Sequence, residues 1–570
     1  MPNNINPPYK GKLQNTLPDE TEKQLLKQKA GNLVQIALSE RSLLDFELLA
    51  NGGLSPLKGF MNKKDYDLVL EKMETSEGIF WPVPVCLDID QKTYEALKNQ
   101  TQAALTDQEG FQLAIIEIED IWKADKAKEA LKLFDTDNTE HPGIKYLKTK
   151  TKDYYIGGTI KAIELPVHYD FRLLRFSPEE LRQTFVKSGW QDIAAFQTRH
   201  PLHRLQFELC LNIIKDHKKK LLINQIAGET KPEDFDRFTR IRATQKIIDK
   251  FPLNSSRLNI LPLYLRFAGY KDALFHSVIS KNYGCSDFIV GHGHSNPMFN
   301  DRSGYFYDNE LIKKRTKEFS KEIDINIIPV SEMRYVYFEE EYQFIDQIPD
   351  SMQSLSISGE EIRKRIKLGK NIPSWASFPE VIEEIEKNYP PPSRQGFTIF
   401  CTGLPSAGKS TIAKVLYSKF LEIGKRPVTL LDGDIVRRNL SKELIFSKEH
   451  RNINVERIGF VANEITKNRG IAICAPIAPY AHTREKIREL IEPNGGFIEV
   501  FVSTPLNVCE GRDRKGMYEK AKKGLIKDFT GVDDPYEIPE NPEVTIDTTM
   551  FSPEECAQQV IQELTRLGYL

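Results

Sequence analysis

The sequence has no long apolar run, no closely spaced cysteine pair and no excess of basic charge. No stretch approaches the ~20 consecutive apolar residues that a membrane span needs, and the first residues, MPNNINPPYKGK, lack the apolar segment of a secretory signal. The net charge of −2 provides no overall basic field for nucleic acid. We therefore expect a cytoplasmic protein without a membrane or nucleic-acid partner, in which local clusters hold any anionic ligand.

The seven cysteines are scattered, odd in number and without a CxxC pair. This usage indicates reduced thiols in a cytosolic protein rather than disulfides or a zinc knuckle. Hydrophobic residues make up 40% and charged residues 28% of the 570 positions, which is an ordinary globular balance. The length is enough for three or four domains of ~100–200 residues each.

The clearest domain boundary is NYPPPSRQG, residues 388–396, because three prolines end the preceding helix and the glycine frees the chain to start again. Residues 394–570 are expected to form a separate domain. Residues 1–170 carry short apolar runs broken by Gly, Pro and Asp, which favours a mainly β domain with some helices. From residue 171 onward, apolar strands alternate with helical stretches, which predicts a parallel α/β sheet. The five strand segments are DIAAFQ, KLLINQI, LNILPL, DFIVG and INIIPV.

The segment GLPSAGKST fits the phosphate-binding pattern G-x-x-x-x-G-K-[ST]. It follows the strand segment TIFCT and opens a helix, a context in which backbone N–H groups wrap phosphates and the helix N-terminus adds positive charge. Lys409 is expected to reach the β- and γ-phosphates of ATP, and Ser410 to offer its hydroxyl to the accompanying Mg²⁺. The expected ATP-binding residues are Gly403, Leu404, Pro405, Ser406, Ala407, Gly408, Lys409, Ser410 and Thr411.

A kinase also needs an acceptor site, and the strand segment VTLLD ends in Asp432-Gly-Asp434. Acids at the carboxyl end of a parallel strand lie near the phosphate loop. They can orient the acceptor hydroxyl or hold Mg²⁺ through water, although a helix cap without chemistry is the other interpretation. Farther on, the Lys- and Arg-rich segment RDRKGMYEKAKKGLIKDFTGVDDPYE has the chain position of a kinase lid that closes over polyphosphate.

Taken together, these segments resemble the successive motifs of adenylyl-sulfate (APS) kinase: GLPSAGKST, DGDIVRRNL, FSKEHRNINVERIG, APIAPY and KGMYEKAKKGLIKDFTGVDDPYE. That family transfers the γ-phosphate of ATP to the 3′-hydroxyl of adenosine 5′-phosphosulfate, which gives the sulfate donor PAPS. The resemblance implies catalytic roles for Lys409, Asp432 and Asp434. It also implies APS-binding roles, with the two phenylalanines near adenine, for Arg437, Phe446, Arg451, Asn454, Lys527 and Phe529.

Three residues depart from the motifs of that family. Glu456 stands where the family usually has a basic residue, Ile445 where it has a glycine, and Ala478 where it often has a serine. None of them belongs to the phosphate loop, so the reaction type is expected to hold. Glu456 and Ile445 leave the identity of the acceptor less closely specified.

The upstream segments resemble ATP sulfurylase (sulfate adenylyltransferase) over most of residues 1–390: ELLANGGLSPLKGFMNKKDY, FWPVPVCLDI, GETKPEDFDRFTRIRA, LPLYLRFAGYKDALFHSVISKNYG and SISGEEIRKRI. Fusion in this order places a reaction that makes APS before one that consumes it. The resemblance implies an α/β multidomain chain that forms a homo-oligomer. Its parts are a PUA-like β-rich domain (1–170), a nucleotidylyltransferase-type Rossmann-like α/β domain (171–330), a small helical extension and linker (331–393) and a P-loop kinase domain (394–570).

Two loops of the sulfurylase-like region differ from the family patterns Q-x-R-N-P-x-H-R-A-H and G-R-D-H-A-G. His200 replaces an asparagine and Gln206 a histidine in the first loop, and His292 replaces an arginine in the second. Arginine is always charged and forks onto phosphate, whereas histidine at pH 7 is mostly neutral. Loss of one such donor typically costs ~10²–10³ in rate. The candidate residues of this site are Gln197, Arg199, His200, His203, Gln206, His292 and His294.

These changes leave three interpretations open. The region is a sulfurylase fold with little or no activity that serves regulation or assembly, a working sulfurylase that joins ATP and sulfate with its own histidines, or a site for another oxyanion, nucleotide or metal. If the family arrangement is kept, the two loops face one cleft and their four histidines converge. Bound polyphosphate would then make the imidazoles cationic, or the histidines would bind a divalent metal.

Overall fold

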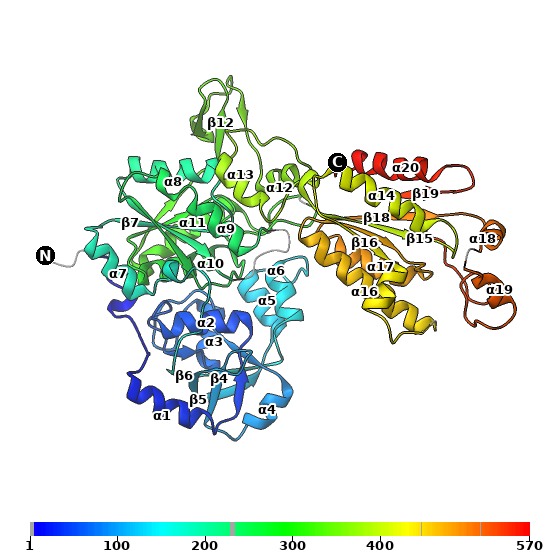
Figure 1. The fold of residues 1–570 in the computed structure, drawn as a ribbon. Helices are drawn as coiled ribbons and strands as arrows, with labels where there is room; N and C mark the ends of the chain where they lie inside the picture. Colours follow the sequence, from blue (N-terminus) through cyan, green and yellow to red (C-terminus); the bar gives the residue numbers. More distant parts are fainter. Residues whose placement is uncertain (1–4, 229–233, 302, 446, 514) are drawn as a thin grey trace. The chain divides into compact units, whose positions relative to one another are not determined.

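The computed structural model describes all residues except 1–4, 229–233, 302, 446 and 514 (Figure 1). The chain divides into two compact units. One consists of residues 1–359 and 373–385, and the other of residues 360–372 and 386–570. Each unit is built around its own buried apolar side chains.

Residues 5–165 fold around a mostly antiparallel six-stranded sheet in the order β1–β4–β5–β6–β2, with β3 also paired to β6. Only β1 and β4 are parallel neighbours. The strands are β1 (Gln35–Ala37), β2 (Gly59–Phe60), β3 (Leu87–Ile89), β4 (Gln102–Thr106), β5 (Gln112–Lys123) and β6 (Tyr154–Ala162). The helices are α1 (Glu20–Ala30), α2 (Glu40–Ala50), α3 (Lys63–Lys72), α4 (Gln91–Leu97), α5 (Lys126–Phe134) and α6 (Pro142–Thr149).

The next part of the first unit is a five-stranded, entirely parallel sheet in the order β11–β10–β7–β8–β9. Its strands are β7 (Ile193–Thr198), β8 (Lys220–Ile226), β9 (Ser256–Leu261), β10 (Asp287–Val290) and β11 (Asn326–Pro329). Its helices are α7 (Pro178–Lys187), α8 (Arg204–Asp216), α9 (Arg237–Gln245), α10 (Gly269–Asn282) and α11 (Asn309–Ile323). All five strands coincide with the apolar segments that predicted them. Because β7 and β10 are parallel neighbours, the loops that follow them leave the same sheet edge.

The six-stranded sheet and the five-stranded parallel sheet of the first unit share one apolar core, which runs from Tyr9 to Ile327 along the chain. A buried ion pair also joins the two parts: Arg266, after β9, donates to both carboxylate oxygens of Asp45 on α2 at 2.8 Å. Both side chains are at most 1% exposed. The PUA-like part is therefore packed onto the parallel sheet rather than tethered beside it.

Residues 331–393, which we expected to be a helical extension, also contain a three-stranded antiparallel sheet. Its strands are β12 (Met333–Val336), β13 (Glu341–Phe344) and β14 (Ser354–Leu355), and the helices are α12 (Gly359–Lys367) and α13 (Pro379–Glu386). Tyr335 packs on Tyr342 across the strand pair and stacks on Trp375. The aromatic run MRYVYF is typical of a strand, and the more regular helices that follow it obscured that signal.

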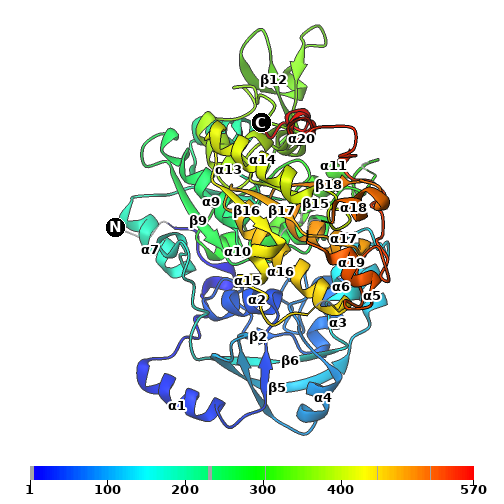
Figure 2. The same ribbon diagram turned by 45° about the vertical axis from the view of Figure 1, so that its right-hand side comes forward.

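The second unit carries another five-stranded parallel sheet, in the order β16–β17–β15–β18–β19. Its strands are β15 (Phe397–Thr402), β16 (Val428–Asp432), β17 (Ile471–Ala475), β18 (Gly496–Val502) and β19 (Val544–Ile546). Its helices are α14 (Lys409–Ile423), α15 (Gly433–Asn439), α16 (Lys448–Lys467), α17 (Ala481–Ile491), α18 (Leu506–Arg512), α19 (Met517–Lys522) and α20 (Pro553–Arg566). Helices α14 and α20 cover one face of the sheet and α16 and α17 the other (Figures 1 and 2).

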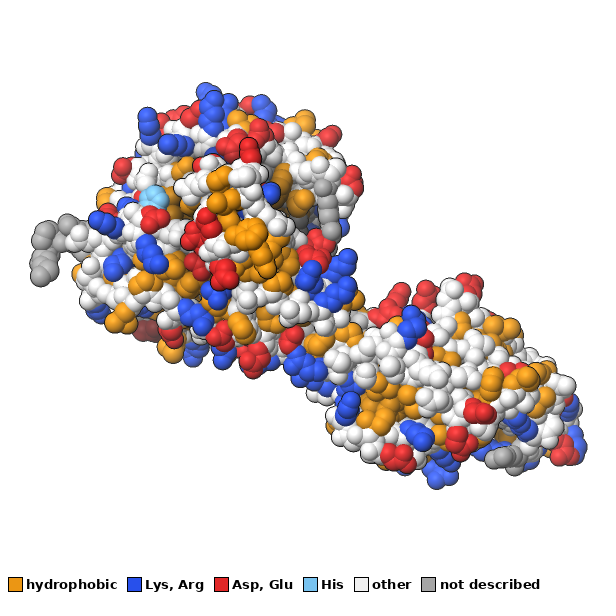
Figure 3. All heavy atoms as spheres, turned by 90° about the horizontal axis from the view of Figure 1, so that it is seen from above, with side chains coloured by type: hydrophobic (Ala, Val, Ile, Leu, Met, Phe, Trp, Pro, Cys, Tyr) orange, Lys and Arg blue, Asp and Glu red, His pale blue; other side chains and the backbone are white. Residues whose placement is uncertain are grey.

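Basic and acidic side chains are interspersed on the face of the molecule shown in Figure 3, in keeping with the small net charge. Within the described residues, no helix combines the length and the apolarity needed to cross a bilayer. The seven cysteines are unpaired, and six of them are buried.

The Asp45–Arg266 pair predicts a large stability effect. Asp45→Asn should lower the free energy of unfolding of the first unit by about 3–5 kcal/mol, because it leaves a buried guanidinium uncompensated. Denaturant unfolding followed by tryptophan fluorescence measures this unit alone, since the chain's four tryptophans are Trp81, Trp122, Trp190 and Trp375. The control is Asp67→Asn, in a pair with Lys63 whose side chains are 35% and 54% exposed. It should cost no more than about 0.5 kcal/mol, and equal losses in the two variants would contradict the assignment.

Candidate functional site

The loop between β15 and α14 is shaped by glycines at two positions where the backbone requires them. Gly403 has φ +145° and Gly408 φ +112°, and a Cβ at Gly403 would lie 2.5 Å from the Val502 carbonyl oxygen. Ser406 also adopts a left-handed conformation, with φ +62°. The loop thus wraps tightly against β18 before α14 begins at Lys409, and the hydroxyl-bearing Ser410 is exposed in the first turn of that helix.

Lys409 is buried inside this loop. Its Nζ donates to the carbonyl oxygens of Gly403 at 2.9 Å and Leu404 at 2.7 Å. Burial lowers the pKa of the Lys409 ammonium to about 8, and nearby groups, including Asp432, only partly oppose that shift. The protein therefore holds a poorly solvated cation at the loop, which an incoming polyphosphate would stabilise.

Two residues that we did not predict brace the other side of the phosphate loop. The hydroxyls of Thr504 and Thr548 both donate to the Ala407 carbonyl oxygen, at 2.9 and 3.0 Å. Arg512 donates to the Thr548 hydroxyl at 2.7 Å and to its carbonyl at 3.1 Å. Arg512 lies in the basic run that indicated a lid, but no sequence pattern marks Thr548, which follows β19.

The acceptor side of this site lies at the same edge of the sheet. Asp432 is the last residue of β16 and pairs in register with Ala475 of β17. Helix α16 contributes Arg451 and Asn454, which are only 7% and 6% exposed. The Oδ1 atom of Asn454 is buried and accepts no hydrogen bond from any residue that the structure describes, so it is available to a donor group of a ligand.

Arg451 is held by partners from the lid segment and from the loop after β17. It donates to the Thr530 hydroxyl at 2.5 Å and to the Tyr480 hydroxyl at 3.1 Å, and it lies 3.0 Å from the Asp534 carboxylate. In this arrangement its guanidinium is fixed by polar groups rather than free to rotate. Arg437, on α15, donates more weakly to the Leu444 carbonyl, at 3.4 Å.

The remaining predicted kinase residues differ in exposure. Phe529 is 7% exposed and packs edge-on against Tyr518, with ring centroids 5.1 Å apart. The Tyr518 hydroxyl donates to the Pro405 carbonyl at 3.0 Å, which connects the lid to the phosphate loop. Lys527 is exposed. Phe446 and the side chain of Asp434 lie outside what the structure describes.

The departures from the kinase motifs fall away from these buried groups. Glu456 pairs with Lys486 at 2.8 Å, and both side chains are more than 40% exposed. Ile445 is 63% exposed. Ala478 adopts a left-handed conformation with φ +46°, and its carbonyl accepts from Arg484 at 2.8 Å. Glu456 therefore belongs to the outer face of α16, opposite Arg451 and Asn454.

The first altered loop of the other unit follows β7. Gln197 is 8% exposed, and its amide donates weakly to Ser280 at 3.4 Å. In the described part of the chain, its Oε1 accepts no hydrogen bond. Arg199 and His200 both face the buried carboxylate of Asp234, at 3.4 and 3.6 Å. The positive charge of Arg199 is thus partly neutralised before any anion arrives, a feature that the sequence motif does not reveal.

The residues at the start of α8 are used for local structure. The side-chain amide oxygen of Gln206 (Oε1) accepts from the His203 backbone N–H at 3.1 Å, as in a helix capping box. The His203 ring is buried, with its Nδ1 2.8 Å from the Ser377 hydroxyl. Gln206, the replacement for a histidine, therefore caps the helix instead of supplying a second imidazole.

The second altered loop follows β10 and places its two histidines differently. His292 is exposed, 3.3 Å from the Asn309 amide and edge-on to Tyr305. His294 is partly buried, and its Nε2 lies 3.1 Å from Nδ1 of His276. Burial, together with the neighbouring His276, lowers the pKa of His294 to about 3. His294 is therefore a neutral imidazole at physiological pH in this state.

The sheet topology brings the two altered loops to one edge. Their four histidines nevertheless contact different residues: His200 contacts Asp234, His203 Ser377, His292 Asn309 and His294 His276. In the part of the chain that the structure describes, no group of three or more His, Cys, Asp or Glu side chains is arranged to hold a metal ion. The metal interpretation of the histidines consequently has no support in the geometry.

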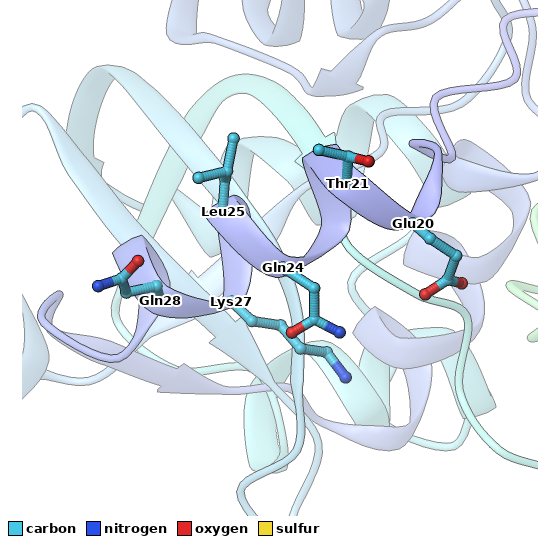
Figure 4. Close-up of a pocket in the computed structure, with 6 residues that line it drawn as sticks. All are labelled: Glu20, Thr21, Gln24, Leu25, Lys27 and Gln28. Atoms are coloured by element: carbon cyan, nitrogen blue, oxygen red, sulfur yellow. The ribbon is translucent and has the colours of Figure 1, made fainter.

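A hollow elsewhere on the surface does not form a site. It runs along α1 and is lined by Glu20, Thr21, Gln24, Leu25, Lys27 and Gln28. Figure 4 shows these side chains leaving a single helix in different directions rather than converging.

Comparison with known proteins matches three family descriptions along the chain: a PUA-like domain at residues 6–165, ATP-sulfurylase at 172–388 and adenylylsulphate kinase at 395–547. Sulfate adenylyltransferases from Phaeosphaeria nodorum and Aspergillus oryzae are 41% and 42% identical, and each alignment covers 99% of both proteins. The structure is similar to a hexameric APS kinase from Thiobacillus denitrificans, with a TM-score of 0.79, 36% identity, and coverage of 99% of this chain and 100% of that one.

The fold and the phosphate loop define a transferase that joins a P-loop kinase domain to a nucleotidylyltransferase-type region with a PUA-like domain. The chain belongs to the sulfate adenylyltransferase family, in the form that carries an adenylylsulphate kinase domain at its C-terminal side. The combination of domains makes it an enzyme of sulfate activation.

The depressed pKa of Lys409 predicts how nucleotide affinity depends on pH. A lysine that titrates near 8 is an ammonium below that pH and loses its charge above it. ADP keeps the same charge above neutral pH, so its Kd should rise by up to about tenfold per pH unit above pH 8. Calorimetric titration of the full chain with ADP at about pH 7 and about pH 9.5 measures the change.

The matched variant for this prediction is Lys409→Arg, which stays charged throughout the range. Its affinity is expected to be lower overall but independent of pH. The assignment to Lys409 is wrong if the arginine variant shows the same loss of affinity at high pH.

Proposed function

We propose that the second unit transfers the γ-phosphate of ATP to the 3′-hydroxyl of APS, producing ADP and PAPS. The observation that carries this proposal is the position of Lys409 and Asn454 at one sheet edge, each buried. Lys409 offers a desolvated cation, and Asn454 offers an acceptor atom that nothing else uses. Lys409 would bind the polyphosphate of the phosphoryl donor, and Asn454 would bind the polar molecule that accepts the phosphoryl group.

The residues of the chain position the reactants rather than react themselves. The 403–411 segment holds the phosphates through backbone N–H groups and Lys409, and Arg451 and Asn454 hold APS. Closure of the lid, with Phe529 and Lys527, excludes water from the transfer. Asp432 and Asp434 orient the acceptor hydroxyl.

Mg²⁺ is proposed to accompany ATP. The exposed hydroxyl of Ser410 and the carboxylate of Asp432 provide oxygen ligands of the kind that this ion prefers. Ser410 lies in the first turn of α14, directly after the phosphate loop, and Asp432 is the last residue of β16 in the same parallel sheet. When bound, the ion would neutralise charge on the transferring phosphoryl group.

The proposal predicts that Lys409→Ala reduces PAPS formation from ATP and APS by about 10³-fold or more, because the transferring phosphoryl group loses its fixed cation. Product formation measured by mass spectrometry tests this. The control is Glu456→Ala, which removes only an exposed ion pair with Lys486 and should leave the rate unchanged. Undiminished PAPS formation by the Lys409 variant would exclude the kinase assignment.

For the first unit, we propose a sulfurylase-type site that binds an oxyanion but makes APS slowly. Gln197 and Arg199 remain at the end of β7, on the side that resembles the family's sulfate side. On the other side, Gln206 is engaged in capping α8, His292 is exposed and His294 is neutral. Expulsion of pyrophosphate needs fixed positive charge on the phosphates, which these three residues supply poorly.

A homo-oligomer is also proposed. The similar protein from Thiobacillus denitrificans is described as hexameric, and the likeness extends over 99% of this chain. Light scattering of the purified full chain would measure the assembly, and a monomer at micromolar concentration would contradict it.

Restoring charge should raise APS synthesis. The double change Gln206→His and His292→Arg is expected to increase pyrophosphate release from ATP and sulfate by at least about tenfold, since each lost donor typically accounts for ~10²–10³. A matched control is His217→Arg, which adds the same group at the exposed end of α8.

Two results would contradict this view of the site. One is wild-type APS synthesis that already equals the kinase rate at neutral pH, which describes a fully bifunctional enzyme. The other is turnover with selenate, molybdate or another nucleotide but not with sulfate, which describes a changed substrate.

A further inference from the structure

Behind the second altered loop, three side chains form a buried line. Asp272 and His276 lie one helical turn apart on α10, and both are 0% exposed. Asp272 Oδ1 lies 3.3 Å from His276 Nε2, and His276 Nδ1 lies 3.1 Å from His294 Nε2. The other oxygen of Asp272 accepts from the Phe267 backbone N–H at 2.9 Å. The line therefore begins at a fixed carboxylate and ends at a residue of the loop.

The groups around this line keep the Asp272 carboxylate ionised. Burial alone would raise the pKa of its carboxyl, but His276 and Arg266 lower it to about 2. Arg266 is itself paired with Asp45. Tyr307, which precedes α11, has a pKa raised mainly by burial and stays a neutral phenol. Asp272 is thus the fixed negative charge of the line, and His294 is a neutral imidazole.

The hydrogen-bonding roles along the line follow from the carboxylate. Asp272 Oδ1 and His276 Nε2 lie at an ion-pair distance of 3.3 Å, and among the described residues neither atom has a hydrogen-bond partner. Because an ionised carboxylate repels a bare nitrogen lone pair, the hydrogen of His276 is favoured on this Nε2 atom. If His276 is neutral, its Nδ1 accepts, His294 donates from Nε2, and Nδ1 of His294 is a bare acceptor. If His276 is cationic, it donates to His294, whose own hydrogen then resides on Nδ1. A single proton on the pair therefore converts His294 Nδ1 from an acceptor into a donor.

That outer atom is the one free to meet a ligand. Within the described residues His294 Nδ1 makes no hydrogen bond, and the loop that carries it leaves the sheet beside the end of β7, where Gln197 and Arg199 lie. A sulfate or phosphate oxygen accepts hydrogen bonds, so it fits His294 only in the donor form.

We propose that Asp272 and His276 are positioning residues that make oxyanion binding at His294 depend on the uptake of one proton, which is stored on His276. This inference rests on the proposed oxyanion site of the first unit. The positive charge that replaces the family's missing arginine accordingly lies on His276, behind the loop rather than in it. The carboxylate of Asp272, and not solvent, stabilises this charge. His294 itself stays neutral and passes on the hydrogen bond.

Calorimetric binding of inorganic sulfate to the full chain tests the proposal. Sulfate does not change its charge between pH 6 and 9, so any proton taken up belongs to the protein. The protons are counted by repeating the titration in buffers with different heats of ionisation. Lys409→Ala serves as the parent, because Lys409 titrates near 8 in the other unit and would add its own proton.

We expect uptake of about one proton per sulfate near pH 8. The Kd for sulfate should then rise by up to about tenfold per pH unit as the pH is raised, because binding consumes a proton. Asp272→Asn and His276→Gln should each abolish the uptake and flatten the pH dependence, since neither variant can stabilise the stored cation. His217→Asn, which removes an exposed histidine at the end of α8, should leave both unchanged.

Two outcomes overturn the inference but not the oxyanion site: sulfate binding without proton uptake in the parent, and proton uptake that persists in both variants. No sulfate binding at any pH overturns the oxyanion site itself and the inference with it. A thermal melt shows whether each variant is folded, and if neither is, the proton count of the parent decides.

Discussion

Positive charge held where parallel strands end is the constraint on which both halves of this protein depend. Reactions on phosphate and sulfate need donors that are fixed before the substrate arrives, since reorienting them during the reaction costs free energy. Each unit provides a five-stranded parallel sheet whose loops emerge at one edge. The two units differ in how much charge they bring to that edge.

In the kinase unit the charge is concentrated and mechanically supported. Lys409 is enclosed by a loop whose glycines let the backbone approach β18 closely, and Thr504 and Thr548 tie that loop down from outside. In the sulfurylase-like unit less positive charge is left for a ligand, because Arg199 faces the Asp234 carboxylate and the loop histidines contact other protein side chains. The two parallel sheets therefore present unequal amounts of fixed positive charge.

The sequence was sufficient for the five strands of the first parallel sheet, for β15 and β16 of the second and for the phosphate loop, because short apolar runs bounded by glycine or acids leave few alternatives. Strands β18 and β19 were not predicted. It was not sufficient for Asp234, His276 or Thr548. Each of these acts through a contact with a residue that is distant in the chain or lies outside any motif, and burial and distance are properties of the fold. Gln206 shows the same limit: its substitution was visible, but its use as a helix cap depends on where α8 begins.

The buried Asp45–Arg266 pair has a consequence for how this chain can be divided by evolution or by engineering. Family descriptions break the first unit near residue 170, yet the ion pair and the apolar core cross that break. A recombination event at this point would separate the Arg266 guanidinium from the buried carboxylate that it hydrogen-bonds and open a core to water. Exchange of modules is consequently favoured near the proline-rich segment before β15, where the kinase fold begins with its own core, and the two N-terminal parts are inherited as one piece.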